Sequence, residues 1–296
     1  MPVGPGSACA VVLTYNRKHL LESCLTAVRA QTRALDEILV VDNASTDGTA
    51  AMVRERFPGV SVLRIERNEG AAAGFSDGIA EAHARGHGWL WLLDDDCLPD
   101  PDALAALLDG AARAPEAPGV PAPVLLASHV VWTDGSSHPM NVPWVRWGQP
   151  GEVALGMGAG LVALRHSTFT SVVLRREVVD RYGLPPRHFY IWVDDIDYTA
   201  RVLRHERAYL VPESRVVHCT AKRYSAVTES GDRFYYHVRN TLLLLRGGAL
   251  DREERLVYAY YWLITLRVFL RGNRLRPRAL ATIARGIRDG IRQDTG

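Results

Sequence analysis

The sequence predicts an α/β fold in which a mostly parallel β-sheet is flanked by helices and followed by a helical C-terminal extension. Two observations lead to this prediction. Over the first hundred residues, short apolar runs alternate with segments of helical periodicity, and such βαβα order is typical of a parallel sheet covered on both faces. Beyond residue 232, only helical patterns occur. A chain of 296 residues is long enough for one such domain with an appendage.

Four strand-like runs and three helical segments make up the first part of the chain. The predicted strands cover residues 9–13, 37–41, 60–65 and 89–93. Between them, apolar residues recur at helical spacing from Leu20 to Val28, a second helix ends near Phe57, and a helix of small residues covers 70–85. This order predicts that the carboxyl ends of the four strands meet at one edge of the sheet.

The second part of the chain is less regular. Residues 114–150 contain seven prolines and three tryptophans without clear periodicity, so we expect an irregular excursion with a hairpin, either a segment that shapes a substrate site or a structural insertion. The elements predicted after it are strands at 160–164, 168–174, 207–211 and 215–218, a helix from 175, a helix ending near 205, and helices at 232–245, 253–270 and 275–291.

Three adjacent carboxylates, Asp94, Asp95 and Asp96, directly follow the fourth predicted strand. Neighbouring carboxylates repel one another unless a cation is held there. Alternate residues of an extended chain face the same side, so Asp94 and Asp96 can bind one divalent metal ion while Asp95 points elsewhere. The simpler interpretation is a turn before a helix that has Asp100 as its N-cap and Pro101 as its first residue. Three acids in a row favour the metal.

Polar clusters lie at the carboxyl ends of all four predicted strands, at residues 14–17, 42–47, 68–70 and 94–96. Ligands of parallel sheets bind at this edge, so the clusters indicate a binding site. The phosphate loop Gly-x4-Gly-Lys-[Ser/Thr] is absent from the sequence, and no Gly-x-Gly-x-x-Gly follows the first strand. A phosphate group bound here must therefore be neutralised chiefly by metal, which suits a diphosphate leaving group.

Composition and charge narrow the class of protein. The formal net charge is +2, but residues 267–292 carry eight arginines and one acid, so the rest of the chain is net acidic. The four cysteines show no metal-type spacing and fit a reducing compartment. The sequence shows neither a signal peptide nor an uncharged apolar run of about 18–20 residues. We therefore expect a cytoplasmic protein.

Five motifs resemble, in order and spacing, those of family 2 glycosyltransferases of GT-A fold. They are Val-Val-Leu-Thr-Tyr-Asn-Arg, Val-Val-Asp-Asn-Ala-Ser-Thr-Asp-Gly-Thr, Arg-Asn-Glu-Gly-x3-Gly, Leu-Leu-Asp-Asp-Asp and Trp-x-Asp-Asp-x-Asp. The triple aspartate, the Trp-x-Asp-Asp and a later histidine are similar to the galactofuranosyltransferase and rhamnosyltransferase-like branch. The resemblance implies a Rossmann-like GT-A catalytic domain at 1–246, with a nucleotide-binding half at about 1–113 and an acceptor half at about 114–246. Residues 247–296 would form a basic helical extension.

The resemblance also implies roles for individual residues. Those implied in binding the nucleotide sugar are Thr14, Tyr15, Asn16, Asp42, Asn68, Asp94 and Asp95. Asp42 would bind the base, a uracil, through its N–H. Asp96 would be the direct metal ligand, with Asp94 and His218 in the same shell. Asp195 would be the general base, and Trp192 and Asp194 would shape the acceptor site.

The implied reaction is an inverting, metal-dependent transfer by single displacement. A base removes the proton of the acceptor hydroxyl while Mn²⁺ or Mg²⁺ stabilises the departing diphosphate. The donor would be a UDP-sugar such as UDP-galactofuranose, or dTDP-rhamnose, and the acceptor a glycan, a lipid-linked sugar or a small molecule. The Gln-x-x-Arg-Trp signature of processive synthases is absent from the sequence, which favours the addition of one or a few sugars in polysaccharide or cell-wall biosynthesis.

Structural interpretations remain open beside these roles. Asp42 could be an ordinary acid near a helix start, and His218 an ordinary buried histidine. Asp194 and Asp195 could simply begin a helix, where acids are favoured by the dipole. The preceding aromatic residues favour a sugar site, because flat aromatic faces suit sugar rings.

The arginine-rich C-terminal segment has three interpretations. It could make peripheral contact with an anionic membrane, at the inner face of the plasma membrane near a lipid-linked acceptor. It could equally be a packed helix with a solvated face, or a contact in a homo-oligomer. Nucleic-acid binding is not expected, because no recognised module accompanies the charge.

Two other functions compete with the transferase. A sugar-nucleotide pyrophosphorylase would share the sheet and the metal, but it normally needs a glycine-rich activating loop where this chain has residues 14–17. A non-catalytic nucleotide-sugar-binding scaffold would be expected to have lost some of the acids, and none is lost in this sequence. The motifs therefore favour the transferase.

Overall fold

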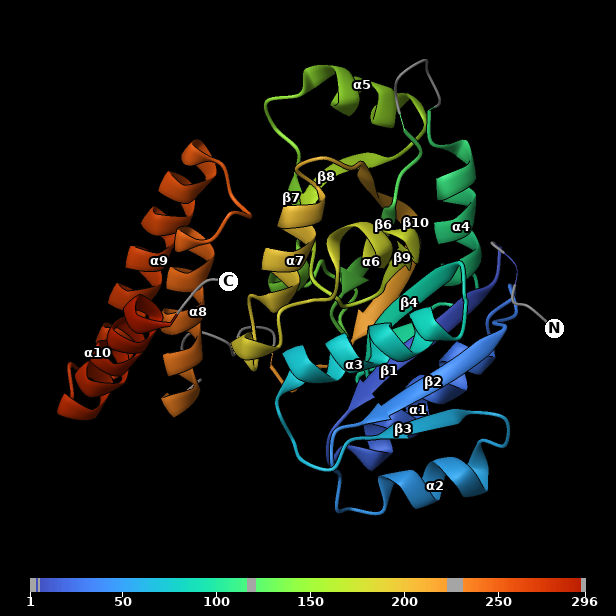
Figure 1. The fold of residues 1–296 in the computed structure, drawn as a ribbon, viewed down its shortest axis with the longest axis horizontal. Helices are drawn as coiled ribbons and strands as arrows, with labels where there is room; N and C mark the ends of the chain where they lie inside the picture. The colour runs from blue at the N-terminus through green and yellow to red at the C-terminus, as the bar shows by residue number, and fades with distance from the viewer. Residues whose placement is uncertain (1–3, 5, 116–120, 223–230, 294–296) are drawn as a thin grey trace.

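The structure is a computed structural model that describes residues 4, 6–115, 121–222 and 231–293 (Figure 1). The strands are β1 (Ala8–Thr14), β2 (Glu37–Asp42), β3 (Ser61–Arg64), β4 (Trp89–Asp94), β5 (Cys97–Pro99), β6 (Leu125–Val131), β7 (Trp144–Val145), β8 (Val162–His166), β9 (Val172–Arg175) and β10 (Ala208–His218). The α-helices are α1 (Lys18–Arg29), α2 (Thr49–Arg56), α3 (Ala71–Ala84), α4 (Ala103–Arg113), α5 (Pro150–Gly158), α6 (Glu177–Tyr182), α7 (Asp194–Val202), α8 (Phe234–Arg246), α9 (Arg252–Gly272) and α10 (Pro277–Arg292).

The described strands form one central sheet in the order β3-β2-β1-β4-β9-β6-β10-β8-β7, with β5 paired to β10. Strands β1 to β4 are parallel to one another. Beyond β4 the sheet is mixed, because β9 runs antiparallel to both β4 and β6, while β6 and β10 are parallel. The predicted α/β fold with a sheet flanked by helices is confirmed, and the parallel part is the N-terminal half.

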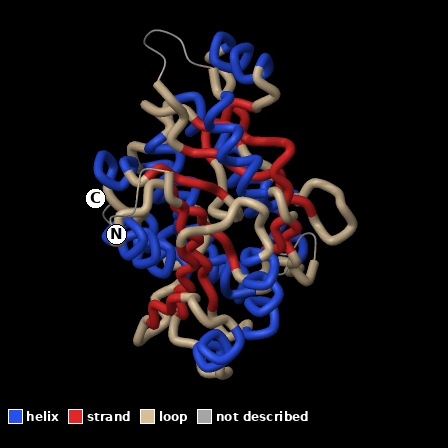
Figure 2. The backbone as a smooth tube through the Cα atoms, turned by 90° about the vertical axis from the view of Figure 1, so that its right-hand side faces the viewer, coloured by secondary structure: helices blue, strands red, loops and turns tan. Residues whose placement is uncertain are grey.

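Helices cover both faces of the sheet (Figure 2), and the alternation of side chains along β1 shows why. Ala8, Ala10 and Val12 pack on one face with residues of α1, α2 and α4. Cys9, Val11 and Leu13 pack on the other face with residues of α3, α6 and α7. A strand that is buried on both sides reads as a continuous apolar run rather than an alternating one, and all of β1 is buried.

Helices α8, α9 and α10 stand together at one side of the molecule, next to α7 (Figure 1). Residues of α8 pack with Phe189 and Val193, which precede α7. A separate cluster joins the three helices through Phe234, Phe269 and Ile283. None of the helices that the structure describes is long and apolar enough to cross a membrane.

The helix after the triple aspartate begins later than predicted. The expected N-cap Asp100 and first residue Pro101 are wrong, because residues Cys97–Pro99 continue as strand β5 and α4 begins at Ala103. The side chain of Gln31 supplies the cap instead, accepting a hydrogen bond from the backbone N–H of Leu104 at 3.0 Å. The acids therefore do not cap this helix.

The region 114–150 is more regular than predicted. Its described part contains β6, which lies inside the sheet between β9 and β10 and is almost entirely buried. The predicted strands at 207–211 and 215–218 are a single strand, β10, whose register shifts between Val211 and Arg215. Pro212 lies within that shift and explains why the sequence pattern breaks there.

Candidate active site

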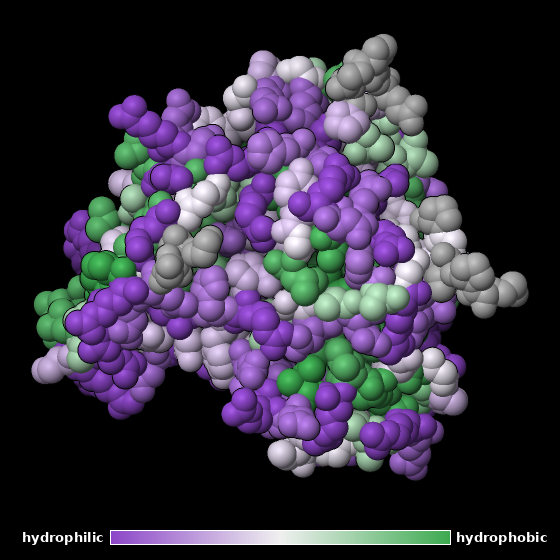
Figure 3. Space-filling view, viewed as in Figure 1, coloured by the Kyte–Doolittle hydropathy of each residue, from purple (hydrophilic) through white to green (hydrophobic). Residues whose placement is uncertain are grey.

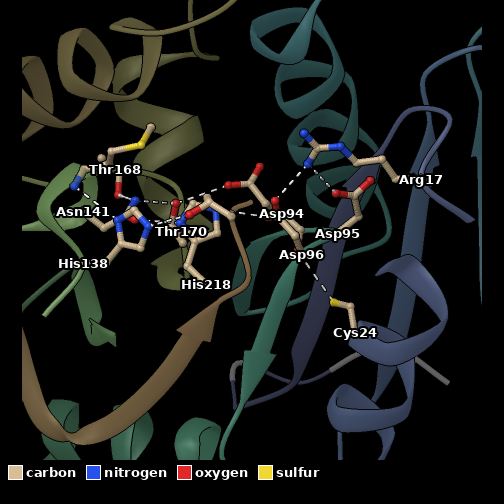
Figure 4. A network of polar contacts seen from close by, with 12 residues as sticks. Arg17, Cys24, Asp94, Asp95, Asp96, His138, Asn141, Thr168, Thr170 and His218 are labelled. Carbon is tan, nitrogen blue, oxygen red and sulfur yellow. Dashed lines mark hydrogen bonds and ion pairs between the residues drawn. The ribbon is translucent and has the colours of Figure 1, made fainter. Parts of the chain in front are cut away.

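The three aspartates at the end of β4 lie between Arg17 on one side and His218 on the other (Figure 4). Asp96 Oδ1 is 3.1 Å from His218 Nε2, and Asp94 Oδ2 accepts a hydrogen bond from the Thr170 hydroxyl at 3.2 Å. One potential ligand atom from each of Asp94, Asp96, Cys97 and His218 lies within 4.8 Å of the others. These are the two carboxylates and the histidine that the resemblance implied as metal ligands, and the fold brings them together.

The buried side chain of Asn141 fixes the orientation of His218. Its Nδ2 donates to the hydroxyls of Thr168 and Thr170, at 3.1 and 2.9 Å, so its Oδ1 is the atom that faces His218 Nδ1 at 2.7 Å. An amide oxygen can only accept. Nδ1 of His218 therefore carries a proton, and in the neutral imidazole Nε2 presents a lone pair toward the acids. Metal-binding histidines are commonly held in this way.

Burial and neighbouring charges shift the pKa values of the acids around this point. Burial raises the pKa of Asp94, and the charge of Asp96 adds to this effect. Burial alone would raise the pKa of Asp96, but His218 and Arg17 outweigh it and lower that pKa. Asp96 Oδ1 is nevertheless buried without a well-oriented hydrogen-bond donor among the described residues, although His218 Nε2 is close. An unpaired buried carboxylate oxygen costs free energy, and a cation at this point would remove that cost.

Asp95 points away from the other two acids, as predicted. Its carboxylate accepts a hydrogen bond from the Thr14 hydroxyl at 2.7 Å and pairs with Arg17 at 3.2 Å. The same guanidinium reaches Asp96 at 2.9 Å. Burial raises the pKa of Asp95 to about 7, while the charge of Arg17 acts to lower it. The sequence assigns Arg17 no individual role, although Arg17 belongs to the polar cluster 14–17 that is predicted at this edge.

The remaining polar clusters of the parallel strands also converge. Asn16 Oδ1 accepts from the backbone N–H of Thr46 at 2.7 Å, and Asn43 Nδ2 donates to Asn68 Oδ1 at 3.1 Å. These contacts bring the ends of β1, β2 and β3 together, as predicted. Tyr15 is exposed beside them.

Asp42 lies fully buried at the end of β2. Its two carboxylate oxygens accept from the Ser45 backbone N–H at 2.8 Å and from the half-exposed Arg64 guanidinium at 3.2 Å. Helix α2 begins after Gly48, where Asp47 rather than Asp42 accepts from Thr49. Asp42 is thus not a helix-start acid, and its role with a base stays a prediction.

On the other side of the acids, a strained segment precedes Asp194 and Asp195. Tyr190 has φ 67° and ψ −59°, the geometry of a strained γ-turn, and the N–H of Ile191 donates to Phe189 O at 2.8 Å across it. Trp192 and the β-branched Val193 also have positive φ, 65° and 72°. Such strain clusters at functional sites. It brings α7 to the site with both aspartates in its first turn.

Asp194 and Asp195 sit in a desolvated environment that also contains Asp94. Burial raises the pKa of Asp195 to about 6, and the charge of Asp94 contributes to the shift. Burial and the charge of Asp195 together raise the pKa of Asp194 well above its usual value. Trp192 is partly buried against the apolar cluster of α8. The charge of Asp94 contributes to both pKa shifts, so two carboxyl groups able to hold or accept a proton lie near the candidate metal site.

Three aromatic residues that were not predicted border this side of the site. The hydroxyl of Tyr258, on α9, lies 2.6 Å from His166 Nε2, and its ring stacks on Trp144 at a centroid distance of 5.0 Å. The charge of Asp195 is among the causes that raise the pKa of Tyr258, after burial. These residues come from three separate segments, so sequence spacing gave no sign of their proximity.

Comparison with known proteins gives consistent results. Residues 9–183 match the family described as Glycosyl transferase family 2. Galactofuranosyltransferase GlfT1 of Mycobacterium tuberculosis is 28% identical over 281 residues, covering 88% of this chain and 90% of the relative. N-acetylglucosaminyl-diphospho-decaprenol L-rhamnosyltransferase of the same organism is 24% identical over 293 residues, covering 89% of each chain.

Solved structures share the fold. The crystal structure of S. aureus TarS 1-349 in complex with UDP-GlcNAc has a TM-score of 0.61 at 16% identity, covering 96% of this chain and 80% of that one. The mannosyltransferase PcManGT from Pyrobaculum calidifontis, in complex with GDP-Man and Mn²⁺, has a TM-score of 0.58 at 20% identity, covering 96% and 76%. These similarities confirm the GT-A-type fold.

Proposed function

This chain belongs to glycosyl transferase family 2 and is a glycosyltransferase, and we propose that it works by a metal-dependent, inverting mechanism with a nucleotide-diphosphate sugar as donor. The observation that carries this proposal is the cluster of Asp94, Asp96 and His218 at the sheet edge. Two protonatable carboxyl groups, Asp194 and Asp195, lie near enough for the charge of Asp94 to raise their pKa values. A metal–diphosphate group and an acceptor hydroxyl could be held on opposite sides of the same space. The curated relatives, a galactofuranosyltransferase and a rhamnosyltransferase, favour UDP-galactofuranose, another UDP-sugar or dTDP-rhamnose.

The residues present fit a divalent cation. Carboxylate oxygens suit Mn²⁺ and Mg²⁺, and imidazole suits Mn²⁺ among the transition metals. Asp96 Oδ1, which is buried without a well-oriented donor among the described residues, and the lone pair of His218 Nε2 would be two of the ligands, with Asp94 beside them. Bound there, the ion would neutralise the negative charge of the leaving diphosphate. PcManGT was solved with Mn²⁺, which supports this assignment.

We assign the donor to the side of the parallel strands. Thr14, Tyr15, Asn16, Asp42 and Asn68 lie at the carboxyl ends of β1 to β3, where ligands of such sheets bind. The guanidinium of Arg17 lies beside Asp95 and Asp96 and is partly exposed, so it can contact a diphosphate once the acids are occupied by metal. The TarS complex with UDP-GlcNAc supports a nucleotide sugar as the ligand of a protein with this fold.

Asp195 is the proposed general base, and Asp194 and Trp192 shape the acceptor site. As the acceptor oxygen attacks the anomeric carbon, its proton passes to a carboxylate oxygen of Asp195. The bond between the anomeric carbon and the diphosphate oxygen breaks on the opposite face, so the configuration inverts. A base with a pKa of about 6 is ionised near neutral pH and retains more basicity than an ordinary aspartate.

The test is a panel of nucleotide sugars screened by thermal shift with and without Mn²⁺, followed by product analysis for each sugar that binds. A donor at about 100 times its Kd should stabilise the chain by roughly 2.7 kcal/mol, and only when metal is present. Asp96→Ala should abolish the metal-dependent part. A panel in which every sugar binds equally well without metal, or in which no sugar is transferred or hydrolysed, would overturn the proposal.

A further inference from the structure

Helix α9 has two very different faces. Its inner face carries Glu254, which is buried against Arg165, and Tyr258 beside His166. Its outer face carries Leu256, Tyr260, Leu263 and Ile264, with exposed fractions of 68, 63, 59 and 38%. These four residues recur at spacings of four, three and one, so they form a single stripe along the helix.

This stripe is unusual for a protein surface. Single exposed apolar residues are common, but a contiguous apolar patch marks an interaction site. Tyr261 and Val268, 56 and 40% exposed, widen the patch. Figure 3 shows apolar side chains gathered along the edge of the molecule where Figure 1 places α9.

Arginines accompany the stripe. Arg267 and Arg271 continue the same helical face beyond Ile264, and among the described residues neither forms an ion pair or a side-chain hydrogen bond. Arg252 and Arg255 lie at the other end of α9, and Arg274 and Arg276 follow it. Among the nearby acids, Glu254 pairs with Arg165 and forms a capping box with Asp251, and Glu253 is exposed, so the six arginines outnumber them. The apolar stripe therefore lies in a field of net positive charge.

We propose that the α9 face, defined as Leu256, Tyr260, Leu263, Ile264, Arg267 and Arg271, docks on the surface of an anionic lipid bilayer. Leucine, isoleucine and tyrosine side chains enter the boundary between headgroups and acyl chains, while arginines reach the phosphate groups. The arginines around the stripe outnumber the acids there, so an anionic surface fits it better than a second, equally basic copy of this chain.

The basic segment for which the sequence allows a membrane contact, residues 267–292, covers the end of α9 and the next helix, α10. In α10 the apolar side is already used: Ala279 and Ile283 are buried with Phe234 and Phe269. An added Cβ at Gly286 would lie 2.7 Å from Val238 Cβ, so α10 packs closely against α8. This matches the alternative of a packed helix with a solvated basic face. Leu280 and Ile291 of α10 are exposed singly, whereas the apolar stripe lies on α9.

The position of α9 has a consequence for the acceptor. A helix with its side chains is about 10–12 Å across, and the inner face of α9 carries Tyr258, whose pKa is raised by burial and by the charge of the proposed base. An acceptor anchored in the bilayer beneath the outer face would thus reach the site over about the width of one helix. This consequence rests on the proposed function, whereas the docking itself does not. The short distance from the bilayer to the site favours a lipid-linked acceptor.

The experiment measures binding of the full chain to vesicles of phosphatidylcholine alone or with 30 mol% phosphatidylglycerol by flotation, without nucleotide or metal. We expect binding only with the anionic lipid, weakened at high salt. Arg267→Gln/Arg271→Gln should weaken it by about 25-fold, from about fivefold for each arginine. Leu256→Ser/Tyr260→Ser/Leu263→Ser should weaken it at least tenfold, since each buried CH₂ group contributes about fourfold.

Matched controls remove the same chemistry elsewhere. Leu155→Ser/Met157→Ser changes two exposed apolar residues of α5, and Arg29→Gln/Arg54→Gln removes two exposed arginines of α1 and α2; both should bind vesicles like the unchanged chain. Equal binding by all variants would overturn the proposal. So would light scattering that showed a dimer lost in the triple-serine variant while vesicle binding was unaffected. A chain that binds vesicles but no nucleotide sugar would instead overturn the proposed function alone.

Discussion

At the scale of single residues, the site depends on side chains whose roles are set by neighbours distant in sequence. His218 is aligned by Asn141, 77 residues earlier, and Asn141 is itself aligned by Thr168 and Thr170. The chain thereby fixes which histidine nitrogen faces Asp96. A histidine free to take either tautomer would offer its lone pair to the metal only part of the time.

Replacing Asn141 tests this alignment. Asn141→Leu keeps the approximate size but removes the acceptor for the His218 Nδ1 proton, so Mn²⁺ affinity should fall by about 10- to 100-fold. The measurement is calorimetric titration of Mn²⁺ in the presence of UDP. Thr168→Val, which leaves the bond from Asn141 to Thr170 intact, should have a much smaller effect. Unchanged affinity in Asn141→Leu would mean that the tautomer is held by something else.

The proposed base gives a second prediction at this scale. Asp195→Asn should lower the single-turnover rate by about 10²-fold or more and leave Mn²⁺-dependent donor binding nearly unchanged. Because the pKa of Asp195 is raised to about 6 and the base must be ionised, the rate of the unchanged enzyme should fall as pH drops through that value, and the variant should lose this dependence. Asp194→Asn should chiefly raise the acceptor KM. A normal rate in Asp195→Asn would move the base to Asp194 or Asp197.

The sequence predicted the residues that stand in motifs at strand ends, because a parallel sheet gathers those ends at one edge. It could not predict Asn141 or Tyr258 as neighbours of the site. Their contacts cross from one half of the chain to the other, and no periodicity or spacing records such contacts.

At the scale of secondary-structure elements, the same distinction holds. Strands β1, β2 and β4 were predictable, because each is a nearly continuous apolar run buried on both faces. Strand β6 is equally buried, but its sequence contains Ser128 and His129 and it follows a proline-rich stretch. Ser128 is tolerated there because its hydroxyl lies 2.7 Å from the hydroxyls of Ser171 and Ser214, partners that only the folded sheet provides.

The strained segment before α7 is the element on which catalysis should most depend. Asn240 of α8, fully buried, donates to the carbonyl oxygens of Phe189, Ile191 and Trp192 at 2.8 to 2.9 Å. Gly70 lies so close on the other side that a Cβ there would lie 2.1 Å from Tyr190 O. The positive φ angles persist because these contacts hold the segment from both sides.

Asn240→Ala should release this segment. Three buried carbonyl groups would lose a donor, so the free energy of unfolding should fall by at least about 1–3 kcal/mol. The turnover rate should fall while the Kd for UDP with Mn²⁺ changes little, because β1 to β4 are untouched. Asn273→Ala, which removes a comparable bond to Phe269 O at the end of α9, is the matched control and should do neither. Urea unfolding and single-turnover rates provide the two measurements.

At the scale of the whole molecule, the C-terminal helices are tied to the sheet by a buried charge. Arg165 at β8 pairs with Glu254 of α9 and also donates to the carbonyl oxygens of Ala200 and Ala249. Both charged side chains are almost fully buried. The ion pair therefore joins β8, α7 and α9 beside the acceptor side of the site, even though the sequence suggested that residues after 246 form a separate extension.

Breaking this ion pair should affect the whole fold. Glu254→Ala leaves the Arg165 charge buried without its partner, which typically costs about 3–5 kcal/mol, and it also removes half of the capping box at the start of α9. Glu253→Ala, at the exposed neighbouring position, should change the free energy of unfolding by no more than about 0.5 kcal/mol. Urea unfolding at pH 7 measures both.

Replacing both partners of a buried ion pair by apolar residues costs less free energy of folding than removing one partner. Arg165→Met/Glu254→Leu should therefore be more stable than Glu254→Ala. If Glu254→Ala instead unfolds like Glu253→Ala, with α9 still helical, the C-terminal helices fold independently of the sheet, and the acceptor side cannot depend on them.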